Sequence, residues 1–249
     1  MRFAASFVAL IALVACDGGP GGGGRGVVDS TDTGSAATND TGRGGSDTGV
    51  NDSGAADSGT GHNPCSTTDA IVTDIDATLT TKDSEWLTQI VDSSHDPEMR
   101  PDANTLMQGY ADKGYAIFYI TARGTGIPMT DDRDPQTVTE DWLTEHGFPD
   151  VQPSHVMLAD GLGAFGNGAE SYKAQAIADL QGQGFVFDWG YGNATSDIGA
   201  YRDAGMDDSS LFMVGDLAGQ DGVTGITNDD AYTQHLPFLS SVSDALCPE

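Results

Sequence analysis

The stretch Asp69-Ala70-Ile71-Val72-Thr73-Asp74-Ile75-Asp76-Ala77-Thr78 decides the fold. Its first half is apolar, which predicts a buried strand over residues 69–74. Asp74 and Asp76 come where that strand ends, so their carboxylates can point into one cleft. Such a pair can supply a nucleophile and a general acid. Asp-rich turns are common in so acidic a chain, and the motif gains weight only from residues further along the chain.

Short apolar runs alternate with helical patterns downstream of this stretch. Further strands are predicted over residues 115–120, 155–158, 185–188 and 211–214, and helices over residues 101–113, 135–146, 170–183 and 196–204. The helix that starts at Pro135 has Asp134 as its N-cap and Gly147 just past its end. This β-α-β-α order predicts an α/β domain, a parallel sheet with helices on both faces.

Polar side chains are expected to gather at the carboxyl edge of this sheet, where such folds bind ligands. Four groups are placed to join Asp74 and Asp76: Thr121 after the second strand, Lys173 just inside the third helix, and Asn193 and Asp197 after a short turn behind the fourth strand. Two carboxylates, a hydroxyl, a lysine and an Asn/Asp pair suit phosphoryl transfer by a carboxylate nucleophile.

The same residues resemble the haloacid dehalogenase superfamily, and within it the lipin-type (LNS2-like) phosphatase domain. The likeness covers about residues 69–214 and is carried by four stretches: Asp74 to Thr80 with Lys82, Tyr115 to Arg123, Lys173, and Gly192-Asn193 with Asp197, Ala200, Tyr201 and Gly205. It implies a three-layer Rossmannoid fold with a central parallel sheet and a minimal cap. It also implies a phosphomonoester hydrolase that forms an aspartyl-phosphate, with phosphatidate or another phospholipid among the expected substrates.

The resemblance implies a role for each catalytic residue. Asp74 is expected to attack phosphorus, and Asp76 to protonate the leaving group and then take a proton from water. Thr121 is expected to donate to a phosphoryl oxygen, and Lys173 to pair with Asp74 and the phosphate. The alternatives are structural, with Asp74 as a turn residue and Lys173 as a surface lysine. Arg123 is expected to bind phosphate or to hold the motif loop, and stays outside the catalytic set.

The resemblance also implies a bound Mg²⁺. Its ligands are expected to be Asp74, the backbone carbonyl of Asp76, and Asn193, because hard oxygen donors suit this ion. Asp197 is expected to reach the ion through water, although an Asp in the first turn of a helix is also favoured by the helix dipole alone.

Some residues depart from the lipin pattern. Ala77 stands where the family usually has Gly, which is tolerable only if its φ is negative, and Ala194 replaces an Arg. Residues 142–149 resemble instead the domain at the end of phosphatidylinositol-transfer proteins, a branch that binds lipid and has lost catalytic acids. The alternative function is therefore a non-catalytic module that binds phosphatidate or phosphoinositide. A scaffold for partners is a third possibility.

The chain before residue 63 is predicted to lie outside the folded domain. Residues 1–16 resemble a bacterial lipoprotein signal that ends in Leu-Val-Ala-Cys, with Cys16 acylated. An ordinary secretory signal is the alternative. Residues 17–62 are rich in Gly, Ser, Thr and Asp and predict a disordered linker, and residues 63–249 form the domain. We therefore expect a lipid-anchored protein of the cell envelope, on the periplasmic side or at the cell surface.

The two remaining cysteines, Cys65 and Cys247, bracket the domain. Outside the cytoplasm an even pair favours a disulfide, and domain termini often lie close together. We expect these two residues to be bonded.

The charge of the chain excludes some partners. The net charge is −28, and 31 of the 38 acidic residues but only seven of the ten basic ones lie after residue 62. Nucleic acids and anionic lipid surfaces are bound through basic patches, so neither electrostatic mode is expected. Gly161 to Gly166 matches G-x-G-x-x-G, but no acidic residue stands at the distance that dinucleotide binding needs. We expect it to be a loop bordering the site.

Overall fold

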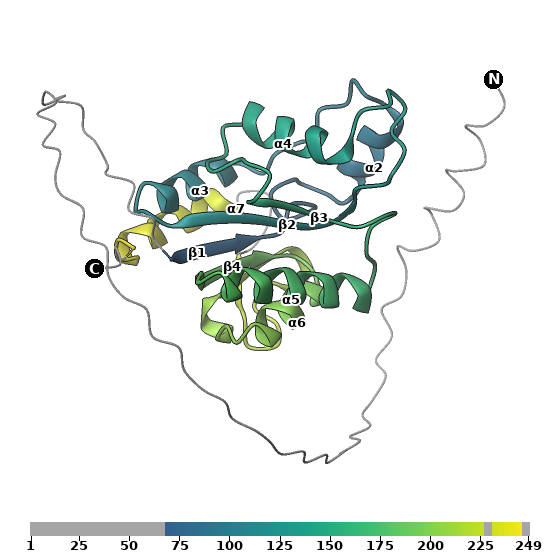
Figure 1. Cartoon of the computed structure of the whole chain (residues 1–249). Helices are drawn as coiled ribbons and strands as arrows, with labels where there is room; N and C mark the ends of the chain where they lie inside the picture. The colour runs from purple at the N-terminus through teal and green to yellow at the C-terminus, as the bar shows by residue number, and fades with distance from the viewer. Residues whose placement is uncertain (1–67, 227–230, 246–249) are drawn as a thin grey trace, which may run out of the picture. The chain divides into compact units, whose positions relative to one another are not determined.

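A six-stranded parallel sheet forms the centre of the described domain (Figure 1). The structure is a computed structural model that describes residues 68–226 and 231–245. The strands are β1 (Asp69–Thr73), β2 (Ala116–Gly124), β3 (Val156–Ala159), β4 (Val186–Gly192), β5 (Leu211–Val214) and β6 (Thr224–Ile226). They lie in the order β3-β2-β1-β4-β5-β6, and every adjacent pair is parallel. The predicted parallel sheet is confirmed.

Helices cover both faces of the sheet, which makes three layers (Figure 1). One face packs against α3 (Ala103–Ala111), α4 (Pro135–Glu145) and α7 (Ala231–His235), and the other against α5 (Asn167–Gly182) and α6 (Thr195–Asp203). Each face of the sheet has its own hydrophobic core. Alternate side chains of β1 pack into the two cores, Ile71 into the one on the first face and Val72 into the one on the second. Short 3-10 turns complete the described chain: Asp208–Ser210, Gly215–Leu217 and Leu236–Ser241.

A small separate hydrophobic cluster is built around helix α2 (Ser84–Val91). This helix lies in the segment between β1 and α3. Its side chains Trp86 and Ile90 pack with Met129, which comes after β2, and with Val138 of α4. The sequence analysis did not predict this helix.

The predicted site residues lie at the switch point of the sheet, where the order of the strands reverses direction. β1 is flanked by β2 and β4. The connections from β1 to β3 use helices on one face, and those from β3 to β5 use helices on the other. The carboxyl ends of β1, β2 and β4 therefore meet where the direction of winding reverses, which is where such folds bind ligands.

Two strand predictions differ from the structure in extent, and β6 was not predicted. β2 runs on to Gly124, so Thr121 and Arg123 belong to the strand rather than to a loop behind it. β4 runs on to Gly192, because residues 189–191 pair with β1, so the short turn comes after Gly192 and not after residue 188. β6 is only three residues long and contains a glycine, too little for a periodic signal.

Several predictions fall outside the described residues and stay predictions: the signal sequence with Cys16, the linker over residues 17–62, the domain boundary at residue 63, and the Cys65–Cys247 disulfide. Within the described ranges, no helix is long and apolar enough to cross a membrane.

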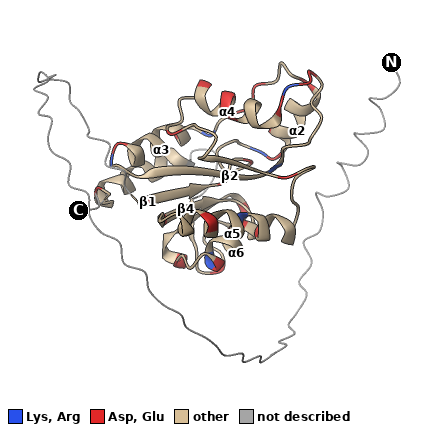
Figure 2. Cartoon of the chain, in the orientation of Figure 1, with Lys and Arg blue, Asp and Glu red and all other residues tan. Residues whose placement is uncertain are grey.

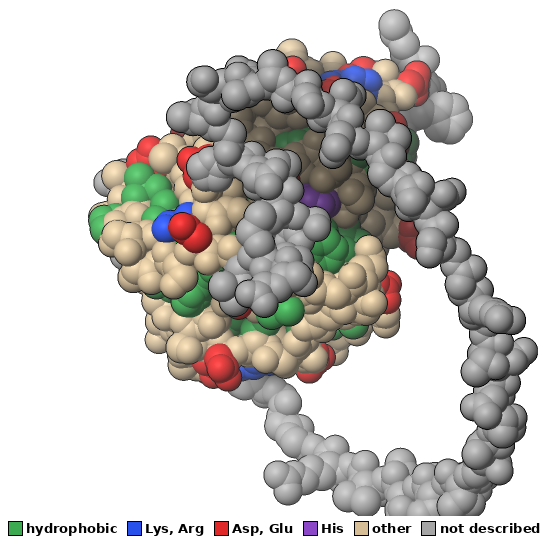
Figure 3. Space-filling view, turned by 60° about the vertical axis from the view of Figure 1, so that its left-hand side comes forward, with side chains coloured by type: hydrophobic (Ala, Val, Ile, Leu, Met, Phe, Trp, Pro, Cys, Tyr) green, Lys and Arg blue, Asp and Glu red, His purple; other side chains and the backbone are tan. Residues whose placement is uncertain are grey.

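Acidic side chains are spread over several helices and loops, and basic side chains are few (Figure 2). The space-filling view in Figure 3 shows hydrophobic side chains in small separate patches on that face. Neither view shows a broad basic patch on the side that it draws.

Candidate active site

Asp74 lies directly beyond β1 and is buried, with 4% of its surface exposed. Its backbone N–H donates to the carbonyl oxygen of Tyr191 on β4 at 3.0 Å, which extends the sheet by one residue. Its Oδ1 lies 2.6 Å from Nζ of Lys173, and its Oδ2 accepts from the Thr78 hydroxyl at 3.0 Å. Both carboxylate oxygens are thus oriented by side chains from other parts of the motif.

Lys173 is a buried cation, not a surface lysine. It belongs to the buried stripe of α5, with Ala169, Ala176 and Ile177, so the helix directs it toward the sheet. Its Nζ lies 2.5 Å from Oδ1 of Asp197 as well as beside Asp74. Burial lowers the pKa of Lys173, but the two carboxylates outweigh this and raise it above its usual value. The ammonium therefore stays charged.

The single positive charge beside the Asp74 carboxylate does not balance its burial and the two acids near it. Burial raises its pKa to about 7; Lys173 opposes that rise, and Asp197 and Asp76 add to it. One ammonium cannot fully offset this desolvation and the neighbouring acids. A further cation beside Asp74 would favour its ionised form.

Asp76 is held by Arg123 and Thr121. The guanidinium of Arg123 donates to Oδ1 at 2.8 Å and to Oδ2 at 2.9 Å, and the Thr121 hydroxyl donates to Oδ2 at 3.1 Å. Arg123 also donates to Thr139 at 3.0 Å and lies over the ring of Trp86 at 4.3 Å.

This geometry puts Arg123 in the site, although the sequence analysis left it out of the catalytic set. Arg123 was expected either to bind phosphate or to hold the motif loop. The structure shows the second, because its guanidinium is bonded to Asp76. The available signal was that it is one of only seven basic residues after residue 62 and stands two residues from Thr121. In the structure Thr121 donates its hydrogen to Asp76, whereas the sequence analysis assigned that hydrogen to a phosphoryl oxygen.

The turn after β4 positions Asn193. Oδ2 of Asp197 accepts from the backbone N–H of Asn193 at 3.0 Å and of Ala194 at 2.9 Å, the reach-back half of a capping box. A Cβ on Gly192 would lie 2.5 Å from Cβ of Asp197, so only glycine fits there. Oδ1 of Asn193 lies 3.1 Å from the Thr78 hydroxyl, which joins it to the Asp74 motif.

Ala77 corrects one expectation. Its φ is 53°, in the left-handed region, and not negative as expected. The tight turn after Asp74 imposes this conformation, because Leu79 and Thr80 both donate their N–H to Ile75. Arg100 compensates by donating to the Ala77 carbonyl at 2.9 Å. The chain therefore makes this turn with an alanine where a glycine would be unstrained, at a cost of about 1 kcal/mol.

The oxygen donors of the site fit Mg²⁺. The carboxylate of Asp74 and the amide oxygen of Asn193 both lie within hydrogen-bonding distance of the Thr78 hydroxyl. Both oxygens of Asp197 are already engaged, which matches a role away from direct contact with an ion. In the described ranges no three His, Cys, Asp or Glu side chains are grouped to hold a metal by themselves. Asn193 and a backbone carbonyl would have to complete the ligand set.

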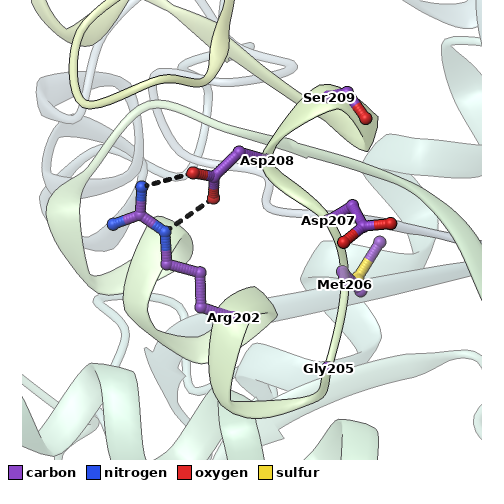
Figure 4. Close-up of a pocket in the computed structure, with 6 residues that line it drawn as sticks. All are labelled: Arg202, Gly205, Met206, Asp207, Asp208 and Ser209. Atoms are coloured by element: carbon purple, nitrogen blue, oxygen red, sulfur yellow. Dashed lines mark hydrogen bonds and ion pairs between the residues drawn. The ribbon is translucent and has the colours of Figure 1, made fainter.

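An open pocket lies at the opposite edge of the sheet, before β5 (Figure 4). It is lined by Arg202, Gly205, Met206, Asp207, Asp208 and Ser209. The guanidinium of Arg202 is bonded to the carboxylate of Asp208 at 2.7 and 3.1 Å. This pocket contains none of the predicted site residues.

Comparison with known proteins places the site in a family. A family model described as "PITM 1-3, LNS2 domain" matches residues 71–215, a range that contains every predicted catalytic and metal-binding residue. Protein retinal degeneration B of Drosophila melanogaster is 28% identical over 176 residues, 70% of this chain and 12% of that protein. Membrane-associated phosphatidylinositol transfer protein 3 of Homo sapiens is 32% identical over 121 residues, 48% of this chain and 11% of that protein. The chain thus spans about a tenth of the length of these relatives.

Two solved phosphatases are among the similar structures. A class C acid phosphatase from Bacillus anthracis with tungstate bound has a TM-score of 0.39 and 21% identity, over 53% of this chain and 54% of that chain. The cobalt-bound deoxy-D-mannose-octulosonate 8-phosphate phosphatase from Haemophilus influenzae has a TM-score of 0.42 and 14% identity, over 69% of this chain and 86% of that chain.

Proposed function

Because this chain belongs to the PITM 1-3 LNS2 domain family, we propose that it is a Mg²⁺-dependent phosphomonoester hydrolase that works through an aspartyl-phosphate on Asp74. Family membership by itself supports a phosphatase-type or a lipid-binding role. The observation that favours catalysis is the state of Asp74: a buried carboxylate at the switch point, fixed by Lys173 at 2.6 Å and Thr78 at 3.0 Å, with a second carboxylate two residues on.

The first step is attack by Asp74. Its carboxylate oxygen forms a bond to phosphorus while the bond from phosphorus to the leaving oxygen breaks. Asp76 gives that oxygen a proton, and the substrate's alcohol departs. Lys173 stabilises the negative charge around phosphorus from a fixed position, because two carboxylates hold its ammonium in place.

The second step hydrolyses the aspartyl-phosphate. Asp76 takes a proton from the water that attacks phosphorus, and the bond to Asp74 breaks and restores the carboxylate. Asp74, Asn193 and the backbone carbonyl of Asp76 would hold Mg²⁺, which would supply positive charge to offset an anionic nucleophile and an anionic substrate. Asp197 keeps Asn193 in position through its backbone.

The proposed substrate is a phosphomonoester, with phosphatidate or another phospholipid as the preferred form. Support comes from two relatives, of mouse and human, that are named membrane-associated phosphatidylinositol transfer protein 3. Acylation of Cys16 would place the domain beside a membrane in the cell envelope, and this stays part of the proposal.

A second candidate function is a non-catalytic module that binds a phospholipid headgroup. The observation that favours it is the double contact between Arg123 and Asp76. A carboxylate held in this way must leave its guanidinium partner before it can carry a proton to the leaving group.

Phosphate release distinguishes the two candidates. The protein is incubated with p-nitrophenyl phosphate or with phosphatidate micelles, in Mg²⁺ or in chelator. We expect Mg²⁺-dependent release that drops at least about a thousandfold in Asp74→Asn, because the nucleophile is lost. Asp179→Asn is the matched control, since Asp179 lies on the exposed side of α5. A folded protein that releases no phosphate but sediments with phosphatidate vesicles would favour the binding module.

A further inference from the structure

The largest exposed hydrophobic side chains do not lie at random. In the described part of the chain, five large apolar side chains stand exposed, and the two most exposed are Phe165 at 61% and Leu162 at 57%. Both belong to the short loop between β3 and α5. Single exposed apolar residues are ordinary, but two on one short loop call for a reason.

This loop is held in place. The N–H of Ala164 donates to the carbonyl oxygen of Ala122 on β2 at 3.0 Å, and Gly126 donates to Gly161 at 2.6 Å. A Cβ on Gly124 would lie 2.2 Å from the backbone nitrogen of Gly163, so the two backbones touch where only glycine fits. The apolar side chains are thus presented by a fixed backbone, which keeps the ordering cost of binding small.

The loop borders the proposed active site. Ala122, which it contacts, lies between Thr121 and Arg123, the two partners of Asp76. In the other direction the loop leads into α5, which carries Lys173. Leu162 and Phe165 therefore stand at the carboxyl edge of the sheet, beside the phosphate site.

Helix α2 adds two more exposed apolar side chains at the same edge. Its Trp86 packs on Arg123, while Leu87 is 41% exposed and Val91 is 51% exposed, one helical turn apart. Figure 1 shows α2 and the loop from β3 to α5 at the same end of the sheet. The fifth exposed residue, Val186, begins β4 and so lies at the opposite edge.

We propose that the carboxyl edge of the sheet rests on a lipid bilayer, with Leu162 and Phe165 inserted among the lipids. This rests on the proposed function and deepens it: the insertion brings a membrane-bound phosphomonoester headgroup to Asp74. The proposed phosphate site lies beside the exposed apolar side chains of the loop. A phospholipid matches both, because it carries a phosphate and apolar chains in one molecule.

The mode of contact is apolar and not electrostatic. The segment from Asp134 to Tyr172, which contains the loop, has no Lys or Arg. Attraction to anionic lipid needs such residues, whereas insertion of Leu and Phe depends on buried apolar area. Binding by this edge is therefore expected to survive high salt.

Vesicle sedimentation tests the proposal. The chain used begins at Asp17, so that neither the apolar signal segment nor an acyl anchor contributes, and it is mixed with phosphatidylcholine vesicles that contain a minor fraction of phosphatidate. The double variant Leu162→Ser, Phe165→Ser is expected to lower the partition coefficient about tenfold, because it removes the inserted apolar area. Val186→Ser is the matched control and should bind like the parent.

Three outcomes would overturn the proposal: no sedimentation of the parent chain, equal sedimentation of the double variant, or loss of binding when salt is raised to about 0.5 M, where surface charges are screened. Turnover separates this proposal from the proposed function. The double variant should hydrolyse soluble p-nitrophenyl phosphate normally and vesicle-borne phosphatidate slowly. If the chain hydrolyses neither substrate but its sedimentation still depends on Leu162 and Phe165, the membrane contact is supported and the phosphatase function is contradicted.

Discussion

At the scale of single residues, Ala77 holds a backbone conformation that L-residues other than glycine, asparagine and aspartate rarely adopt. Arg100 and the Thr80 hydroxyl hold its peptide groups, so the turn survives with a side chain on it. The strain energy is the conformational energy of alanine in the left-handed backbone region minus that of glycine in the same region.

Ala77→Gly should therefore stabilise the protein, although most glycine substitutions destabilise. We expect the free energy of unfolding in urea to rise by about 1 kcal/mol, the left-handed penalty less the added chain entropy of glycine. Ala174→Gly, inside α5, is the control and should lower the same quantity by a similar amount. A destabilised Ala77→Gly variant would show that the turn carries no strain.

The site residues differ in how far the sequence could place them. Asp74 and Asp76 could be placed because they lie just beyond an apolar strand, and Thr121 because it follows the apolar run of the neighbouring strand; parallel strands bring such positions together. Lys173 could be placed only through the motif, since it lies 99 residues from its partner Asp74. The pairing of Arg123 with Asp76 was not predictable, because a strand-end arginine can equally face a substrate.

At the scale of elements, the same contrast holds. Helix α4 was predicted at both ends, since Asp134 caps it through the Thr137 N–H at 3.0 Å and Pro135 starts it. Helix α2 was not predicted: it is only eight residues long, its N-cap residue Asp83 makes no side-chain cap, and its apolar residues belong to a small separate cluster.

Helix α7 is attached in a way that makes the fold sensitive to acid. His235 lies 3.0 Å from the Tyr191 hydroxyl and stacks on Phe238 with 4.9 Å between ring centres. Burial lowers its pKa from 6.5 to about 4. The folded protein keeps His235 neutral in a pH range where the unfolded chain protonates it.

Stability should therefore fall as the pH drops from 6.5 toward 4, and it should be fully present above 6.5. His235→Gln keeps a hydrogen-bonding group without titrating in this range. We expect it to reduce the loss of unfolding free energy between pH 6.5 and 4.5 by roughly 1 kcal/mol, a figure discounted for partial exposure. The measurement is urea unfolding at several pH values. An unchanged pH slope in the variant would show that His235 does not control the docking of α7.

At the scale of the whole molecule, charge is the dominant feature. The chain has a net charge of −28, and its folded part holds only seven basic residues. Three of these, Arg100, Arg123 and Lys173, are buried at or near the site, so few remain to neutralise the surface. Repulsion among the surface carboxylates should destabilise the folded state at low ionic strength.

Salt should accordingly stabilise the protein. Raising NaCl from about 20 mM to about 0.5 M is expected to raise Tm by about 5 °C, because the Debye length shrinks below the spacing of surface charges. Mg²⁺ at matched ionic strength should add a further increase, and Asp74→Asn should remove only that increase. A Tm that falls with NaCl would contradict the repulsion, and equal effects of Mg²⁺ in both proteins would contradict a specific site.

The most direct test of the central claim is to trap the covalent intermediate on Asp74. The protein is mixed with a phosphomonoester and Mg²⁺, quenched in acid, reduced with borohydride and digested, so that an acyl phosphate is converted to homoserine at its position. We predict homoserine at residue 74 and none at residue 76. Phosphate release without any modification of Asp74 would contradict the aspartyl-phosphate mechanism, and a folded protein with neither release nor modification would leave a lipid-binding domain.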